Sequence, residues 1–310
     1  MSLRRLLLAL VAVTGGILLA ARALGPFDAA AVGAAIGAAD ARLLIAAVGF
    51  VLLTITARTL RAILILRAAG AEASRAAIGE VFLVGWWLNA VLPARAGDAY
   101  RIAALRATSG GGRAIGSLVA ERAMDLVAVA TIAAVAVTAR FGDHIPPAIA
   151  IAVAIAAAIA LAAFAFLLGA RRFAERLPHP ALRRAAGGIG DVTVALRPVA
   201  GRAIALTIVG WIAEVGRFAC VAYAIGSAEA IGFGGIAAAA IVAALLSTVP
   251  FSPAGLGIAE AGVAVMTTAA GVPPEIAAAA VIIDRACSTG IIVLGGIPVA
   301  ARRLTRGRGR

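Results

Sequence analysis

Long apolar runs constrain this chain more than any other feature of its sequence. A helix needs ~20 apolar residues to cross the hydrocarbon core of a bilayer, and six windows are candidates for such spans. They are Leu6–Ala21, Leu43–Ala57 with its continuation to Leu66, Ala114–Ala139, Ile145–Gly169, Ala203–Ile225 and Ile276–Ala301. Hydrophobic residues make up 63% of the chain and charged residues only 14%, a composition too apolar for a soluble fold. We expect an all-α polytopic membrane protein, with about six full spans in one membrane domain covering residues 1–310.

The first apolar run also has some character of a secretory signal peptide. Arg4 and Arg5 precede Leu6–Ala21, and a small-residue segment follows it. Because the chain beyond it is itself membranous, we predict an uncleaved first span.

The arginines predict how the chain is oriented. All basic residues are arginines, and most lie in short segments between the apolar runs, so we expect them to set topology and not to bind nucleic acid. The positive-inside rule is obeyed if only Arg22, Arg42 and Arg140 of these loop arginines face outward. Both termini are then cytoplasmic, with an arginine-rich cytoplasmic loop at 170–202 and a basic tail at 302–310. The expected location is the bacterial inner (cytoplasmic) membrane, as a multi-pass protein.

The chain contains two further apolar segments. The arginines follow the positive-inside rule only if neither of these segments crosses the membrane. The first, near 78–108, is interrupted at Pro93–Gly97, and the second, near 236–271, is interrupted between Ser247 and Glu260. We predict two re-entrant helical hairpins, the first from the cytoplasm and the second from outside. Such broken backbone survives at membrane depth only where protein packs around it or it lines a wet cavity.

The surroundings of the two hairpins match, which indicates an inverted repeat of residues 1–169 and 203–301. A charged pair at i, i+3 spacing precedes each hairpin: Arg58 and Arg61 in the first half, Glu214 and Arg217 in the second. An acid beside an arginine follows each: Glu121-Arg122, with Asp125 one turn on, and Asp284-Arg285. Interrupted segments at corresponding positions of two halves are the sequence pattern of inverted-repeat transporters, whose site lies where the breaks meet.

Charged side chains within spans cost several kcal/mol, so each needs a partner or a task. For any single pair of charged residues, a structural role is a sufficient explanation: an ion pair that fixes the register of two helices. Where the charges coincide with the breaks, the amides of Gly97-Asp98 and Gly255-Leu256-Gly257, together with arginine, suit a phosphate. The predicted headgroup and cavity residues are Asn89, Arg95, Gly97, Asp98, Arg101, Glu121, Arg122, Asp125, Glu214, Arg217, Pro250, Gly255, Gly257, Glu260, Asp284 and Arg285.

Nothing in the sequence predicts a catalytic residue, a metal site or a cofactor. Cys220 and Cys287 lie inside apolar segments, where cysteine usually acts as a small hydrophobe. His144 and His179 stand alone in the segments between the apolar runs, without the spacing of a metal site.

Three motifs in order carry a family resemblance. They are Asn89-x-x-x-Pro93-x-Arg95-x-Gly97-Asp98-x-x-Arg101, Glu121-Arg122-x-x-Asp125 and Pro250-x-x-Pro253-x-Gly255-x-Gly257-x-x-Glu260. Through them nearly the whole chain resembles the lysylphosphatidylglycerol synthase transmembrane-region family, also called flippase-like proteins. Asp98 stands where glutamate is usual in the family, and Ala254 where glycine is common, which leaves the substrate open.

The resemblance implies a lipid flippase similar to the membrane half of bacterial aminoacyl-phosphatidylglycerol proteins. The chain ends at Arg310 without the soluble transferase domain, so lysyl transfer is not expected. The expected partners are membrane lipids: an anionic phospholipid, a glycolipid or a polyprenyl-linked lipid. Two alternatives stay open, namely a membrane-embedded lipid-modifying transferase with Asp98 or Glu121 as general base, and a transporter of small anions or other solutes.

Overall fold

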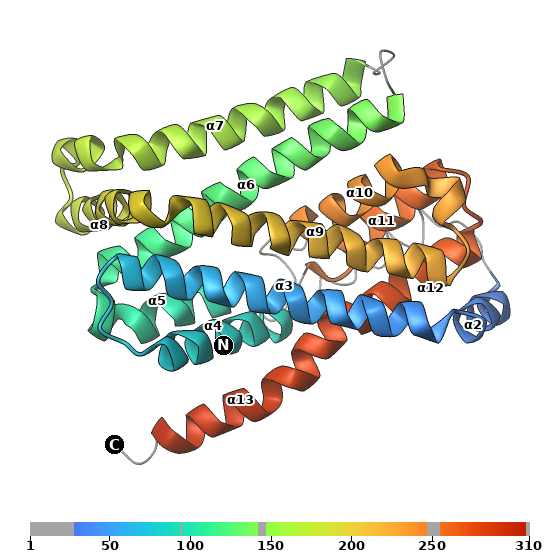
Figure 1. Ribbon diagram of the computed structural model, residues 1–310, viewed down its shortest axis with the longest axis horizontal. Coiled ribbons are helices and arrows are strands. Elements are labelled where there is room, and N and C mark those ends of the chain that lie inside the picture. The colour runs from blue at the N-terminus through green and yellow to red at the C-terminus, as the bar shows by residue number, and fades with distance from the viewer. Residues whose placement is uncertain (1–27, 94, 142–146, 247–254, 308–310) are drawn as a thin grey trace.

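The computed structural model describes residues 28–93, 95–141, 147–246 and 255–307, and every regular element in these ranges is helical (Figure 1). The first predicted span, Leu6–Ala21, and the second predicted break around Pro250 lie outside the described residues. The fold within the described ranges is therefore all-α, as the sequence predicts.

Five helical stretches are long and apolar enough to cross a membrane, and they coincide with five of the six predicted windows. Their elements are α3 (Ala41–Ala68), α6 (Gly111–Phe141), α7 (Pro147–Arg176), the stretch Pro180–Ala224 that ends with α9 (Ala200–Ala224), and α12 (Pro274–Arg285) continued through a π-helical turn, η3 (Ala286–Gly290), into α13 (Ile291–Gly307). Large apolar side chains such as Leu161, Phe164 and Leu168 of α7 are exposed, as expected of surfaces that face lipid. The chain is a multi-pass membrane protein.

The first interrupted segment forms a helical hairpin. α4 (Arg75–Val91) ends at Leu92, whose backbone is extended, and α5 (Ala96–Ser109) begins after Arg95, which has a left-handed backbone with φ of 52°. The chain therefore breaks where Pro93–Gly97 predicts. The amide of Glu72, before α4, donates to the carbonyl of Thr108 near the end of α5 at 3.1 Å, so both helices meet the same end of the molecule (Figure 1).

Two glycines allow α4 and α5 to pack closely beside this break. A Cβ added at Gly97 would lie 1.7 Å from the carbonyl oxygen of Gly85, and one added at Gly85 would lie 2.6 Å from the Cγ of Arg101. The hairpin thus depends on backbone-to-backbone contact, which only glycine permits at this separation.

The second interrupted segment lies at the opposite end of the molecule (Figure 1). α10 (Ala228–Leu246) starts just after α9 ends, bends at Gly232, where φ is 67°, and is followed by α11 (Ile258–Ala269). Buried apolar residues of both helices share a core with α2 (Ala29–Gly37), α9 and α12. In Figure 1 α10 and α11 approach the middle of the molecule from one end, and α4 and α5 approach it from the other.

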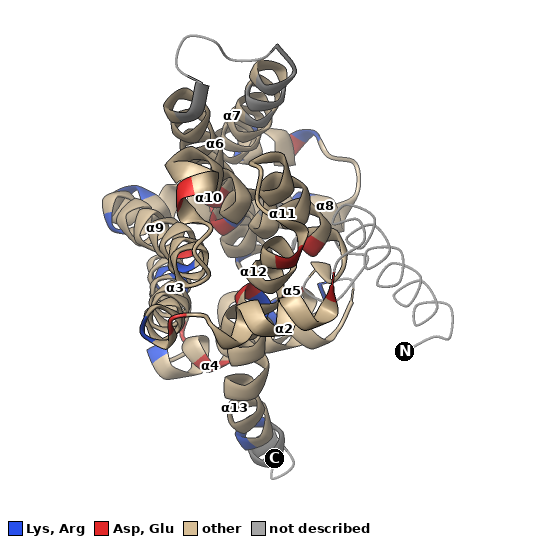
Figure 2. Ribbon diagram, turned by 90° about the vertical axis from the view of Figure 1, so that its right-hand side faces the viewer, with Lys and Arg blue, Asp and Glu red and all other residues tan. Residues whose placement is uncertain are grey.

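Helices α3 and α9 pack along each other in opposite directions (Figure 1). At one end the amide of Asp40, the N-cap of α3, donates to the carbonyl of Ala224 at 3.0 Å. Viewed along the helices, charged residues lie inside the bundle as well as on its rim (Figure 2). The buried ones include Arg61 on α3 and Arg217 on α9.

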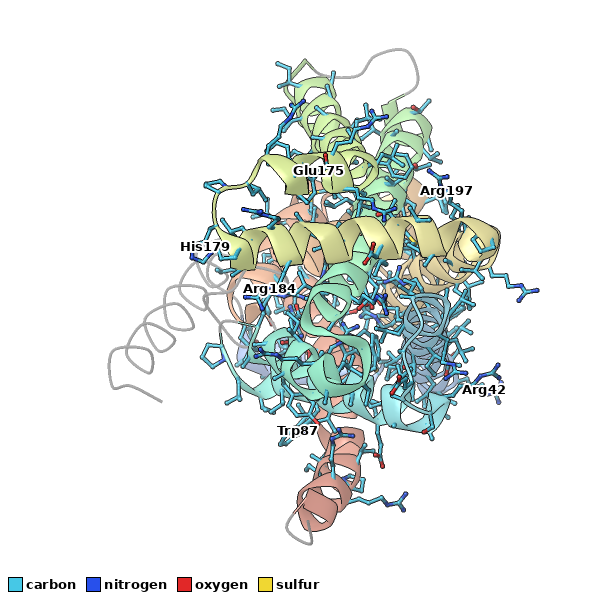
Figure 3. The ribbon with its side chains drawn as sticks, turned by 90° about the vertical axis from the view of Figure 1, so that its left-hand side faces the viewer. Arg42, Trp87, Glu175, His179, Arg184 and Arg197 are labelled. Atoms are coloured by element: carbon cyan, nitrogen blue, oxygen red, sulfur yellow. The ribbon has the colours of Figure 1, made fainter. Side chains whose placement is uncertain are left out.

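The segment predicted as an arginine-rich loop at 170–202 differs from that expectation because most of it is helical. α7 continues to Arg176, α8 covers Pro180–Leu196, and the 3₁₀ turn η1 (Arg197–Val199) leads into α9. Figure 3 shows α8 lying across one end of the bundle, with Arg184 near its start and Arg197 just beyond its end. Helix α8 docks tightly against α6 because Gly188 has no side chain: a Cβ there would lie 2.1 Å from the backbone of Gly112.

We predict that Gly97→Ala destabilises the protein, because the new methyl group has no space against the Gly85 backbone. Gly49→Ala on α3 is the control, since a Cβ at Gly49 meets nothing within 4 Å and alanine is the better helix former by about 1 kcal/mol. The melting temperature of the purified protein in detergent measures both. The tight hairpin packing is refuted if Gly97→Ala melts at or above the temperature of Gly49→Ala.

Candidate functional site

A cavity of about 180 Å³, here called the central cavity, lies between elements of the two halves and has several charged side chains in its lining. Its polar lining comes from α3, from the α4–α5 break, and from α6, α9, α12 and η3. The polar and charged residues of this central cavity are Thr54, Arg58, Asn89, Arg95, Arg122, Glu214, Arg217, Asp284, Arg285, Ser288 and Thr289. The structure thus brings together side chains that are more than 200 positions apart in the sequence.

Ion pairs between different helices hold this cavity in shape. Arg61 of α3 donates to Asp125 of α6 through both terminal nitrogens, at 2.7 and 3.1 Å. Arg217 of α9 pairs through its Nη1 with Asp284 of α12, and its Nη2 lies 3.3 Å from Glu214. Each half therefore links the span before its hairpin to the span after it through one buried arginine and one aspartate.

Each hairpin is held by an acid in the first turn of its second helix. Asp98 of α5 accepts from the Nε of Arg95 at 2.8 Å and lies 3.3 Å from the Nη2 of Arg122 on α6. Glu260 of α11 lies 2.6 Å from the Nε of Arg285 on α12. An acid at this position is also favoured by the helix dipole. The second half thus repeats the arrangement of the first.

Three of the five amides that we expected to bind phosphate at the breaks have partners within the chain. The amide of Gly97 donates to Oδ1 of Asn89 at 2.9 Å, and that of Asp98 donates to the carbonyl of Arg95 at 3.0 Å. The amide of Gly257 donates to Oε2 of Glu260 at 2.6 Å. An anion in the cavity would therefore be bound by arginine side chains and not by these three amides.

The pair of Arg101 and Glu121 lies outside the cavity lining. Arg101 Nη2 is 2.7 Å from Oε1 of Glu121, and the Arg101 guanidinium stacks over the ring of Phe82, 4.5 Å from its centroid. Both charged side chains are buried. These two predicted site residues pack α5 against α4 and α6 beside the cavity.

A second cavity, of about 450 Å³, adjoins the first and has an apolar wall. Leu118, Leu126 and Val129 of α6 form this wall, and Arg58, Arg95 and Arg122 contribute to both cavities. The two cavities together thus offer a charged centre with an apolar compartment beside it.

The predicted site residues fall into three groups. Those that line one or both cavities are Asn89, Arg95, Asp98, Arg122, Asp125, Glu214, Arg217, Asp284 and Arg285. Those outside the lining are Gly97, Arg101, Glu121, Gly255, Gly257 and Glu260, although Glu260 contacts the cavity through Arg285. Pro250 lies outside the described residues.

Five polar or aromatic residues that line the central cavity have no counterpart in the predicted set: Thr54, Arg58, Trp86, Ser288 and Thr289. Arg58 carried a sequence signal, as a charge inside an apolar run. Ser288 and Thr289 did not, because the π-helical turn η3 brings them to the cavity, and such turns are often found at functional sites. In the described ranges, no three His, Cys, Asp or Glu side chains are grouped so as to hold a metal ion.

We expect Asp125→Ala to lower the free energy of unfolding by about 3–5 kcal/mol, because it leaves the buried Arg61 without its carboxylate. The double variant Arg61→Met with Asp125→Leu should recover most of that loss, since neither member of this pair then carries a buried charge. Asp191→Ala is the control, because its pair with Arg171 is exposed and should contribute less than about 1 kcal/mol. Denaturant titration in detergent measures all three. Equal stability of Asp125→Ala and Asp191→Ala would contradict the structural role of the pair.

Comparison with known protein families identifies this cavity-forming domain. The model of the lysylphosphatidylglycerol synthase TM region matches residues 6–296, which include both hairpins and every span described above except the end of α13. The comparison with curated proteins gives no match. The chain belongs to the lysylphosphatidylglycerol synthase transmembrane-region family.

Proposed function

We propose that this protein moves an anionic lipid across the bacterial inner membrane by passing its headgroup through the central cavity. The observation that carries the proposal is the meeting of arginines from both halves, Arg95 and Arg122 from the first and Arg217 and Arg285 from the second, around one cavity. Arginine binds phosphate oxygens through paired donors and keeps its charge at any physiological pH. Membership of a family named for a lipid synthase supports a lipid as the substrate.

The direction of the helices supports a re-entrant, inverted arrangement. The hairpin α4–α5 begins and ends near Glu72 and Thr108 at one end of the molecule, and α10–α11 begins and ends at the other (Figure 1). We interpret the first as entering from the cytoplasm and the second from outside. Neither hairpin then crosses the membrane, and both bring their broken ends toward the middle of the bilayer, where transporters with inverted repeats bind their substrates.

The apolar wall of the second cavity favours a lipid over a small anion. A phospholipid has a charged phosphate next to acyl chains, and Leu118, Leu126 and Val129 lie beside Arg122 in the same compartment. A cavity for a free inorganic anion needs no such wall. We therefore propose that the headgroup occupies the charged centre while the acyl chains lie along α6.

Single cysteines test the topology, in a background where Cys220 and Cys287 are replaced by serine. Ser74→Cys and Ala107→Cys lie on exposed positions at the two ends of α4–α5, so an impermeant thiol reagent should label both from the cytoplasmic face alone. Ala230→Cys and Ala269→Cys, at the ends of α10–α11, should be labelled from the opposite face alone. Labelling of Ser74→Cys and Ala107→Cys from opposite faces would show that this segment spans.

Proteoliposomes with a fluorescent phosphatidylglycerol test transport. Wild type should expose the labelled headgroup to a membrane-impermeant quencher faster than protein-free liposomes do. Arg95→Ala, Glu260→Gln and Arg285→Ala should each slow this at least about tenfold, since one charge-assisted hydrogen bond contributes about 1.5–3 kcal/mol.

Arg184→Ala is the matched control, because Arg184 is exposed on α8 and away from the cavity (Figure 3). It should transport at the wild-type rate. The proposal is wrong if wild type moves no lipid, or if the three cavity variants match Arg184→Ala. Flux of inorganic phosphate without lipid movement would favour the small-anion alternative, and a chemically altered lipid would favour the transferase.

A further inference from the structure

Arg58 differs from the other arginines of the bundle interior in its partners. Six of them, Arg61, Arg95, Arg101, Arg122, Arg217 and Arg285, have a carboxylate oxygen within 4.0 Å. Arg58 has none among the described residues. The undescribed segment 247–254, which follows α10, contains no Asp or Glu that could serve.

Two tryptophans hold the Arg58 side chain in place. Its Cζ lies 5.6 Å from the ring centroid of Trp86 on α4 and 5.1 Å from that of Trp211 on α9. Trp211 is itself fixed, because its Nε1 donates to Oδ1 of Asp125 at 3.2 Å. Cation–π contact positions the guanidinium but leaves its N–H groups without acceptors. Indeed Nε and Nη2 of Arg58 are buried and have no hydrogen-bond partner in the described structure.

A buried hydrogen-bond donor without an acceptor costs free energy. A guanidinium held in this way is therefore suited to bind a ligand that supplies the acceptor. The count of interior charges is consistent with this interpretation. Seven arginines lie in the bundle interior but only six carboxylates do: Asp98, Glu121, Asp125, Glu214, Glu260 and Asp284. The surplus of one positive charge matches a group with a single negative charge. A phosphodiester carries that charge and offers two oxygens to the fork of an arginine.

The position of Arg58 selects the kind of phosphodiester. Arg58 lines both cavities, with Ser288 and Thr289 on one side and Leu118 and Leu126 on the other. An anionic phospholipid bound there would place its phosphate at Arg58, its polar headgroup toward the hydroxyls and its acyl chains along the apolar wall. We propose that Arg58, clamped between Trp86 and Trp211, binds the phosphodiester of an anionic phospholipid at the junction of the two cavities. This assignment rests on the proposed function, because it names the substrate class of the same site.

Tryptophan fluorescence can report on this site with little interference. The chain has three tryptophans, and two of them flank Arg58. In a Trp87→Phe background, every remaining tryptophan is therefore a probe of the clamp. The experiment titrates this protein in detergent with short-chain phosphatidylglycerol, with short-chain phosphatidylcholine and with glycerol 3-phosphate.

We expect a saturable fluorescence change with phosphatidylglycerol and at least about tenfold weaker responses to phosphatidylcholine, which has no net charge, and to glycerol 3-phosphate, which has no acyl chains. Arg58→Gln should weaken phosphatidylglycerol binding at least about tenfold, since a charge-assisted contact is lost. The affinity of Arg58→Lys for phosphatidylglycerol should lie between those of the background protein and Arg58→Gln, because lysine keeps the charge but lacks the paired donors of the guanidinium. Arg42→Gln, an exposed arginine on the same helix α3, is the matched control and should bind as the background does.

The inference is overturned if Arg58→Gln, eluting as a monodisperse species, binds phosphatidylglycerol as tightly as Arg42→Gln does. It is also overturned if glycerol 3-phosphate binds as tightly as the lipid, which would indicate a site for a free anion. Failure of the proposed function looks different: lipid binding would still depend on Arg58 while proteoliposomes showed no headgroup movement. If transport proceeds but neither binding nor transport depends on Arg58, this inference alone fails.

Discussion

The structure depends on neutralising charges that have been taken out of water. An unpaired charged side chain at mid-bilayer costs several kcal/mol, and this bundle buries arginines and carboxylates at its centre. The solution is to pair residues from different helices, as Arg61 does with Asp125 and Arg217 with Asp284. Each pair joins two helices, so the need to keep both charges paired fixes the positions of these helices relative to each other. The hairpin helices pack against the helices that these pairs hold together.

The two halves use this constraint in the same way. In each, an acid near the start of the second hairpin helix, Asp98 or Glu260, contacts an arginine of the following span, Arg122 or Arg285. The first turns of α5 and α11 are thereby tied to the helices that follow them, α6 and α12. A ligand that competes for these arginines would loosen the same contacts that hold the hairpins.

Much of this fold can be predicted from the sequence. Spans are predicted from hydropathy summed over many residues, and the first helix break is predicted from proline and glycine, whose backbone preferences are strong. Five span windows match helices, since hydropathy over about twenty residues outweighs local detail. The first break falls at Pro93–Gly97, because proline removes a backbone hydrogen bond from a helix interior and Gly97 contacts the Gly85 backbone. The helix in the arginine-rich segment 170–202 was not predicted. The position of α8 depends on close packing between Gly188 and Gly112, which are 76 positions apart in the chain.

The site was less predictable than the fold because partner choice is a tertiary property. Spacing along the helix suggests that Asp125 pairs with Arg122, yet those side chains are 3.9 Å apart and the closer partner is Arg61. No local pattern shows that Arg58 lies between Trp86 and Trp211, which come from two other helices. The charged residues themselves were visible as exceptions in apolar runs, so the sequence indicated where the site lies but not which of its arginines lacks a carboxylate.

The central claim is that a lipid occupies the compartment between the two hairpins, and photo-crosslinking in native membranes tests it most directly. A photoreactive amino acid at Leu118, on the apolar wall of the second cavity, is compared with one at Leu161, on the exposed face of α7. Mass spectrometry then identifies the lipids captured at each position. The account predicts that anionic phospholipids are enriched at Leu118 relative to Leu161, where capture should follow the bulk membrane composition. Capture of no lipid at Leu118, or of the same mixture at both positions, would contradict it.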